Sequence, residues 1–179
     1  ALAKVGDVVT LSFTVSEILN SNPTVTIDGN AATIGGANPN YTATYTTQAA
    51  DTEAVFTYTI DVIDLAGNTT NYTTVTDAST VTFDETLPTA PAVSIFSNNA
   101  NTALAKVGDD ITLSFTVDEP LLGNPTVTID GNATTLGGSY PSYTATYTMV
   151  GGETSGVLPF TLDFTDAVGN GAPQVTSTT

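Results

Sequence analysis

An internal repeat restricts the possible folds of this 179-residue chain more than any other feature of its sequence. Residues 1–77 align without a gap with residues 103–179, and 44 of the 77 aligned positions are identical. A duplication of this length predicts two copies of one folding unit, each long enough to bury a core of its own. We therefore expect two domains, at residues 1–87 and 88–179.

The residue pattern within each copy is typical of β-strands. Apolar residues alternate with Thr and Ser over the first long strand of each copy, which predicts one face on a core and one in water. The alternating apolar residues are Val9, Leu11, Phe13 and Val15, matched by Ile111, Leu113, Phe115 and Val117. The turns Asp28-Gly29 and Asp130-Gly131 join short alternating runs and predict tight hairpins. Since helical periodicity is absent, the fold class is predicted to be all-β.

The number and spacing of the strands favour a Greek-key β-sandwich, because each copy contains about seven short strands joined by tight turns. The second copy has an additional strand at residues 92–96 that the first copy lacks. The first copy ends with residues 79–83, for which the second has no counterpart. We expect the sequence to be an excerpt of a tandem array, cut after the first strand of one repeat and within the last strand of another.

Composition excludes several classes of function. The chain carries a formal net charge of −16 with two basic residues, and it has no histidine and no cysteine. Disulfides, thiolate metal sites, most zinc sites and catalysis by Ser-His-Asp or Cys-His are therefore excluded. The negative charge predicts repulsion from nucleic acids and anionic membranes, and no apolar run is long enough for membrane insertion. Paired acids such as Asp61 and Asp64 recur beside turn residues in both copies, so we expect no enzymatic activity.

Three motifs occur in the same order in both copies. They are Lys-Val-Gly-Asp, an alternating strand ending at Glu17 or Glu119, and Asp-x-x-Gly-Asn at residues 64–68 or 166–170. Over essentially the whole chain this order resembles the bacterial immunoglobulin-like tandem repeats of large extracellular adhesins and surface proteins. The resemblance implies two immunoglobulin-like β-sandwiches in a tandem array at the cell surface, often with calcium at the domain junctions.

The acidic residues suggest where such a calcium ion would bind. Consecutive loops of a sandwich alternate between its two ends, which places several acids near the domain junction. Converging carboxylates repel one another, whereas Ca²⁺ takes 6–8 oxygen ligands. We therefore hypothesise a calcium site that stiffens the junction, built from Asp84, Glu85, Glu119, Asp166 and Asn170. The equivalent site of the first copy would use Glu17, Asp64 and Asn68.

A purely structural interpretation of the same motif remains open. In Asp-x-x-Gly-Asn the aspartate would accept backbone N–H groups, while glycine and asparagine would take left-handed conformations. Asp28 and Asp130 are likewise expected to be turn residues rather than ligands.

Three hypotheses for the function follow. The first is a structural extender that projects another domain of an extracellular protein, with neighbouring repeats of the same chain as its partners. The second is a subunit of an extracellular filament or surface layer that assembles with copies of itself by strand exchange. The third is a carbohydrate- or protein-binding module, which would need exposed aromatic residues outside the repeat. Only Tyr72 and Tyr140 are of this kind.

Overall fold

The computed structural model describes residues 1–153 and 155–179, and it divides into two compact units. Unit 1 comprises Ala1–Glu85 and unit 2 comprises Thr86–Thr179. The described residues form strands and turns, which confirms the predicted all-β class. Among these residues there is no helix of the length and hydropathy that a membrane span requires.

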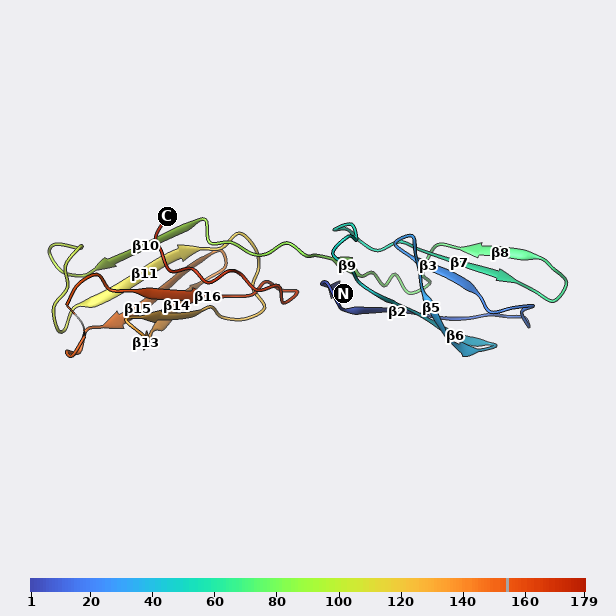
Figure 1. Cartoon of the computed structure of the whole chain (residues 1–179), viewed down its shortest axis with the longest axis horizontal. Helices are drawn as coiled ribbons and strands as arrows, with labels where there is room; N and C mark the ends of the chain where they lie inside the picture. The colour runs from blue at the N-terminus through green and yellow to red at the C-terminus, as the bar shows by residue number, and fades with distance from the viewer. Residues whose placement is uncertain (154) are drawn as a thin grey trace. The chain divides into compact units, whose positions relative to one another are not determined.

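Unit 1 contains two sheets and a short parallel pair (Figure 1). The three-stranded sheet has the order β2-β6-β5, and the four-stranded sheet has the order β4-β3-β7-β8. The short strands β1 and β9 pair in parallel. The strands are β1 (Leu2–Ala3), β2 (Val8–Thr14), β3 (Thr24–Ile27), β4 (Asn30–Ala31), β5 (Thr33–Ala37), β6 (Asn40–Thr46), β7 (Tyr58–Ile63), β8 (Thr69–Tyr72) and β9 (Thr82–Phe83).

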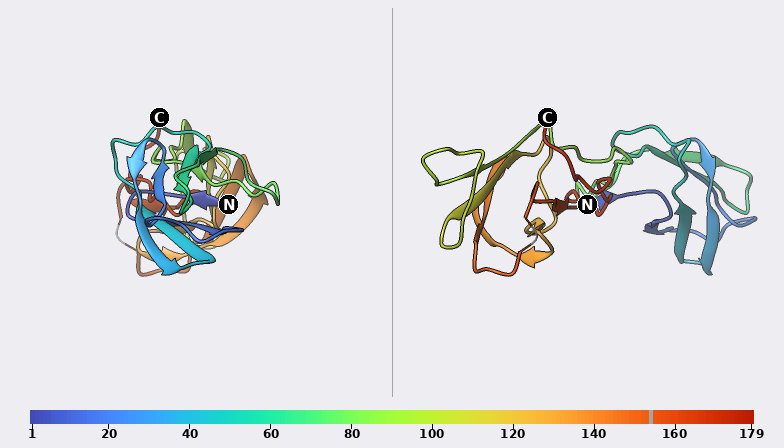
Figure 2. Two further views of the ribbon diagram at one scale, coloured as in Figure 1. Left: turned by 90° about the vertical axis from the view of Figure 1, so that its right-hand side faces the viewer. Right: turned by 60° about the vertical axis from the view of Figure 1, so that its left-hand side comes forward.

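Unit 2 has a similar arrangement, with one strand more in its first sheet, one strand fewer in its second sheet and no parallel pair among its described residues (Figures 1 and 2). Its four-stranded sheet has the order β10-β11-β15-β14, and its three-stranded sheet has the order β13-β12-β16. The strands are β10 (Ala92–Ser97), β11 (Asp110–Thr116), β12 (Thr126–Ile129), β13 (Asn132–Ala133), β14 (Thr135–Ser139), β15 (Ser142–Thr148) and β16 (Phe160–Asp163).

The strand order identifies the architecture. An immunoglobulin sandwich has strands A, B, E and D in one sheet and strands C and F in the other. In unit 2 these are β10, β11, β15 and β14, facing β12 and β16. In unit 1 the corresponding strands are β2, β6 and β5, facing β3 and β7, and among the described residues β2 pairs with β6 alone. The predicted immunoglobulin-like sandwich fold is therefore confirmed.

The missing strand changes the burial of matching residues. In β11, Leu113 is 0% exposed and Phe115 is 2% exposed, whereas their counterparts Leu11 and Phe13 in β2 are only half-buried. The Phe13 and Tyr41 rings stack with centroids 5.7 Å apart, close to the 5.5 Å of the matching pair in unit 2. These two ring pairs thus lie alike, and the difference in burial follows from β10, which pairs along the edge of β11 in unit 2.

The predicted hairpin turns are present in both units. Asp28 and Gly29 have φ angles of 50° and 78°, and Asp130 and Gly131 have φ angles of 49° and 75°. Two consecutive positive φ angles are the signature of the type I′ turn that Asp-Gly favours. Asp28 and Asp130 are therefore turn residues, as expected.

Candidate functional site

The carboxylate of Asp166 closes the loop that follows β16. Asp166 is 1% exposed, and its Oδ1 accepts hydrogen bonds from the backbone N–H groups of Val168, Gly169 and Asn170 at 2.8, 2.6 and 2.8 Å. Its Oδ2 accepts a bond of 2.8 Å from the side-chain amide of Asn170. A buried carboxylate loses its contact with water and needs hydrogen-bond donors in its place, and here four donors meet that need.

The matching loop of unit 1 is built in the same way but is more exposed to solvent. Asp64 accepts a bond of 2.8 Å from the backbone N–H of Asn68 and one of 2.7 Å from its side-chain amide. The side-chain bond from Asn68 has the larger effect and its backbone bond the next, and together they hold the pKa of Asp64 below its ordinary value.

One part of the structural interpretation of this loop is wrong. Gly67 and Gly169 have φ angles of 90° and 99°, as a tight turn requires. Asn68 and Asn170 are not among the described residues with left-handed backbones. Each asparagine serves instead as a double donor to the aspartate, and this role fixes its conformation.

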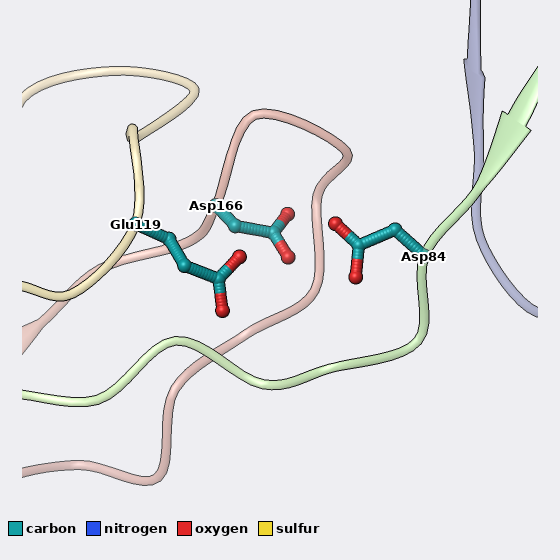
Figure 3. Close-up of side chains that lie close together, drawn as sticks. All are labelled: Asp84, Glu119 and Asp166. Atoms are coloured by element: carbon teal, nitrogen blue, oxygen red, sulfur yellow. The ribbon is translucent and has the colours of Figure 1, made fainter. Parts of the chain in front are cut away.

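Glu119 lies next to Asp166 on the neighbouring loop of unit 2 (Figure 3). The two loops are joined by a β-bridge between Leu121 and Asp166 and by a bond of 2.9 Å from the N–H of Ala167 to the carbonyl of Pro120. Glu119 and Asp166 each offer a carboxylate oxygen within 4.8 Å of the other. Unit 2 therefore brings together two acids that are 47 positions apart in the sequence.

No basic side chain of unit 2 balances this pair. The only lysine of unit 2 is Lys106, which precedes β11, whereas Glu119 follows it, so the strand separates them by roughly 20 Å. For two carboxylates 4.8 Å apart, an effective dielectric constant of about 20 gives a repulsion on the order of 3 kcal/mol. The actual repulsion is smaller, because Glu119 is half-exposed and water screens its charge. A bound dication would turn this repulsion into attraction.

Asp118 makes a structural contact that our sequence analysis did not predict. Its carboxylate accepts bonds of 2.7 and 2.6 Å from the backbone N–H and the hydroxyl of Thr89, which fixes the start of unit 2. Burial raises the pKa of Asp118, but the bonds from Thr89 outweigh it and the pKa lies below its ordinary value. A signal was available, because Asp118 departs from the repeat at the position of Ser16.

The remaining acids proposed for the junction belong to unit 1. Asp84 follows β9, and its backbone N–H donates to the carbonyl of Ala3 at 3.0 Å. The backbone N–H of Glu85 donates to the carboxylate of Glu53 at 2.8 Å. Within unit 2, Glu119 and Asp166 are two acids that could contribute ligands to a metal ion (Figure 3).

The residues proposed as a calcium site in the first copy do not form a comparable cluster of acids. Glu17 is exposed, and its backbone carbonyl accepts a bond of 2.6 Å from the side-chain amide of Asn38. Within the part of the chain that the structure describes, Glu17 and Asp64 belong to no group of three acids. The loop of Asp64 and Asn68 is therefore a turn with at most two carboxylates nearby.

Solved structures show what the fold resembles. The chain is similar to an I-band fragment of titin, with a TM-score of 0.54 and 12% identity over 99% of this chain and 60% of that one. It also matches SGBP-B of the Bacteroides ovatus mixed-linkage glucan utilization locus, in complex with a mixed-linkage heptasaccharide. That match has a TM-score of 0.26 and 17% identity over 99% of this chain and 41% of that one, and it supports no argument. No protein-family model and no curated protein sequence matches the chain.

Proposed function

We propose that this chain is a structural extender of a longer extracellular protein and has no catalytic role. The observation that carries the proposal is the succession of two immunoglobulin-like units in one chain, joined by a short segment. Eight residues separate β9 from β10, and Pro88 and Pro91 are among them. Proline fixes its φ angle and so restricts bending of such a connection. Similarity to a fragment of titin is consistent with this function and establishes only the fold.

Calcium is the second part of the proposal. Asp84, Glu119 and Asp166 would hold the ion, with Glu85 and the carbonyl oxygen of Asn170 as further ligands. The donor atoms fit, because Ca²⁺ prefers carboxylate and carbonyl oxygens. Asp84 precedes Thr89 by five residues, and Thr89 is bonded to Asp118. Since five extended residues span at most about 17 Å, Asp84 stays within reach of the acids of unit 2. A shared ion would restrain the connecting segment and neutralise the carboxylates.

Calorimetry and small-angle X-ray scattering of the whole chain, with calcium and with chelator, test this proposal. At a free calcium concentration of about a hundred times the Kd, binding should raise the unfolding free energy of unit 2 by about 2.7 kcal/mol. Its melting temperature should then rise by roughly 10 °C or more. Scattering should show a narrower range of inter-unit distances with calcium.

A variant pair makes this test specific. Glu119→Gln should abolish the calcium response, whereas Asp64→Asn, in the matching loop without a third acid, should retain it. Equal melting curves and equal scattering with calcium and with chelator would contradict the metal site and leave a flexible tandem chain.

Self-assembly by strand addition is a second candidate function. The observation that favours it is the edge of β2, with which no strand other than β6 pairs among the described residues. Sedimentation velocity at increasing protein concentration separates the two candidates. An extender stays monomeric, whereas a filament subunit grows with concentration.

A further inference from the structure

We propose that Asn132 of unit 2 is the acceptor of an N-linked glycan. Such a modification presupposes the extracellular placement of the proposed function, because acceptor asparagines lie on surface loops of secreted proteins. The chain contains four Asn-x-Thr sequences in which the middle residue is not proline, which is the pattern of an acceptor. They begin at Asn40, Asn68, Asn71 and Asn132. These four asparagines differ in what holds them in place.

Three of the four asparagines are held firmly by the fold. Asn68 donates its side-chain amide to the carboxylate of Asp64 at 2.7 Å, and Asn71 donates its own to the carboxylate of Asp61 at 2.8 Å. Hydrogen bonds to a charged acceptor are stronger than neutral ones, so these two amides are restrained. Asn40 begins β6, which pairs with β2 on one side and with β5 on the other. The threonine two residues later therefore lies in the middle of a sheet.

Asn132 lies at the exposed edge of a sheet. It follows the type I′ turn of Asp130 and Gly131, and its side chain is exposed. Its amide donates to the backbone carbonyl of Asp130 at 3.1 Å, a neutral bond at the surface that water can replace. Strand β13 (Figure 1) has two residues and, among the described residues, pairs with β12 alone. So short an edge strand opens at low cost.

The threonine of this sequence is the group that has to move. The hydroxyl of Thr134 donates to the carbonyl of Val127 at 3.0 Å, and an enzyme that contacts this hydroxyl has to break that one neutral bond. The matching residue of unit 1 is Ala32, although residues 28–30 form the same turn there. Because the hairpin of unit 1 forms without a hydroxyl at this position, the hydroxyl of Thr134 is not required for folding and is available for recognition.

The transfer needs an activated sugar, which a lipid-linked oligosaccharide supplies. The amide nitrogen of Asn132 attacks the anomeric carbon of the first sugar, so a carbon–nitrogen bond forms and the bond from that carbon to the phosphate oxygen breaks. The lipid diphosphate leaves, and the amide proton passes to a base of the enzyme. The product carries a bulky hydrophilic group on β13, where it covers a sheet edge that could otherwise pair with another strand.

Glycan transfer to the folded whole chain tests this inference. The purified protein is incubated with a lipid-linked oligosaccharide and a bacterial oligosaccharyltransferase that selects an acid two residues before the acceptor asparagine. Asp130 is such an acid, and residues 38, 66 and 69, which precede the other three asparagines, are not acidic. Intact mass should rise by one oligosaccharide, and peptide mapping should place it on Asn132. The reaction depends neither on calcium nor on how the units are spaced, so it can fail while the extender function stands.

Two reciprocal variants use the difference between the hairpins. Thr134→Ala copies the residue of unit 1 and should abolish transfer while unit 2 stays folded. Ala32→Thr copies the residue of unit 2 and should create a second acceptor at Asn30, which Asp28 precedes by two residues. The mass gain should then correspond to two oligosaccharides.

A third variant separates the fold from the sequence pattern. Thr69→Asp gives Asn71 an acid two residues before it, yet no transfer to Asn71 is expected in the folded chain, because its amide is held by Asp61. A synthetic peptide of residues 126–138 is the control for enzyme activity. Three results would overturn the inference: an unmodified chain when the peptide is modified, a glycan that persists in Thr134→Ala, or equal transfer to Asn71 and Asn132 in Thr69→Asp.

Discussion

The sharpest test of the difference between the two units is one substitution made at two matching positions. Leu113 and Leu11 occupy the same place in β11 and β2, and each lies opposite an alanine that is 0% exposed, Ala145 and Ala43 respectively. Leu113 is 0% exposed and has Ile95 of β10 beside it in the same sheet, whereas Leu11 is half-buried and lines an open groove of unit 1. Their replacement by alanine removes the same atoms from two different surroundings.

The expected loss of unfolding free energy in each variant follows from how deeply the replaced leucine is buried. Leu113→Ala leaves an enclosed cavity, so the lost transfer free energy and the cavity term add to about 3 kcal/mol. Leu11→Ala leaves a space open to water, so only part of the transfer term is lost, about 1 kcal/mol. For domains of this size the melting temperature falls by roughly 4–8 °C per kcal/mol, which gives about 12–24 °C for unit 2 and about 4–8 °C for unit 1.

Urea unfolding of the whole chain, followed by amide signals in each unit, measures both costs in one molecule. Each variant should destabilise its own unit. Equal costs in the two units would refute the reasoning, because they would mean that Leu11 is covered as fully as Leu113.

Two further predictions concern single residues of unit 2. The N–H of Val150, with the N–H of Gly151 and the phenol of Tyr147, lowers the pKa of Glu153 from 4.5 to about 2. Its stabilising contribution is therefore complete above pH 4.5 and lost as the pH falls toward about 2, and Glu153→Gln should flatten this part of a pH series of unit 2 melting temperatures. Gly138→Ala should lower the unfolding free energy of unit 2, measured in urea, by about 2 kcal/mol or more. Gly138 has a φ angle of 84°, and an added Cβ would lie 2.5 Å from the carbonyl oxygen of Ser142. Gly123→Ala is the control, because a Cβ at that position meets nothing within 4 Å.

The candidate site was only partly predictable from the sequence. The Asp-x-x-Gly-Asn motif indicated that Asp166 closes a turn, because the donors are local in sequence. The proximity of Glu119 depends on two loops that are joined through Leu121 and Ala167, far apart in the chain. Asp118 was missed since its partner Thr89 lies 29 residues upstream, and no local pattern connects them.

The sequence by itself determined the local conformation: alternation specified the strands, Asp-Gly specified the type I′ turns, and the duplication specified two similar units. These features follow from interactions between residues close in the chain, which any copy of the motif repeats. The tertiary structure alone decided burial and the distance between the carboxylates of Glu119 and Asp166, which loop order had only placed at the same end of the domain. The same Thr-Leu-Ser-Phe-Thr segment is enclosed in one unit and lines an open groove in the other, because a strand from elsewhere in the chain covers only one of them. Burial depends on what packs against a residue, and the residue's own sequence neighbours do not contain that information.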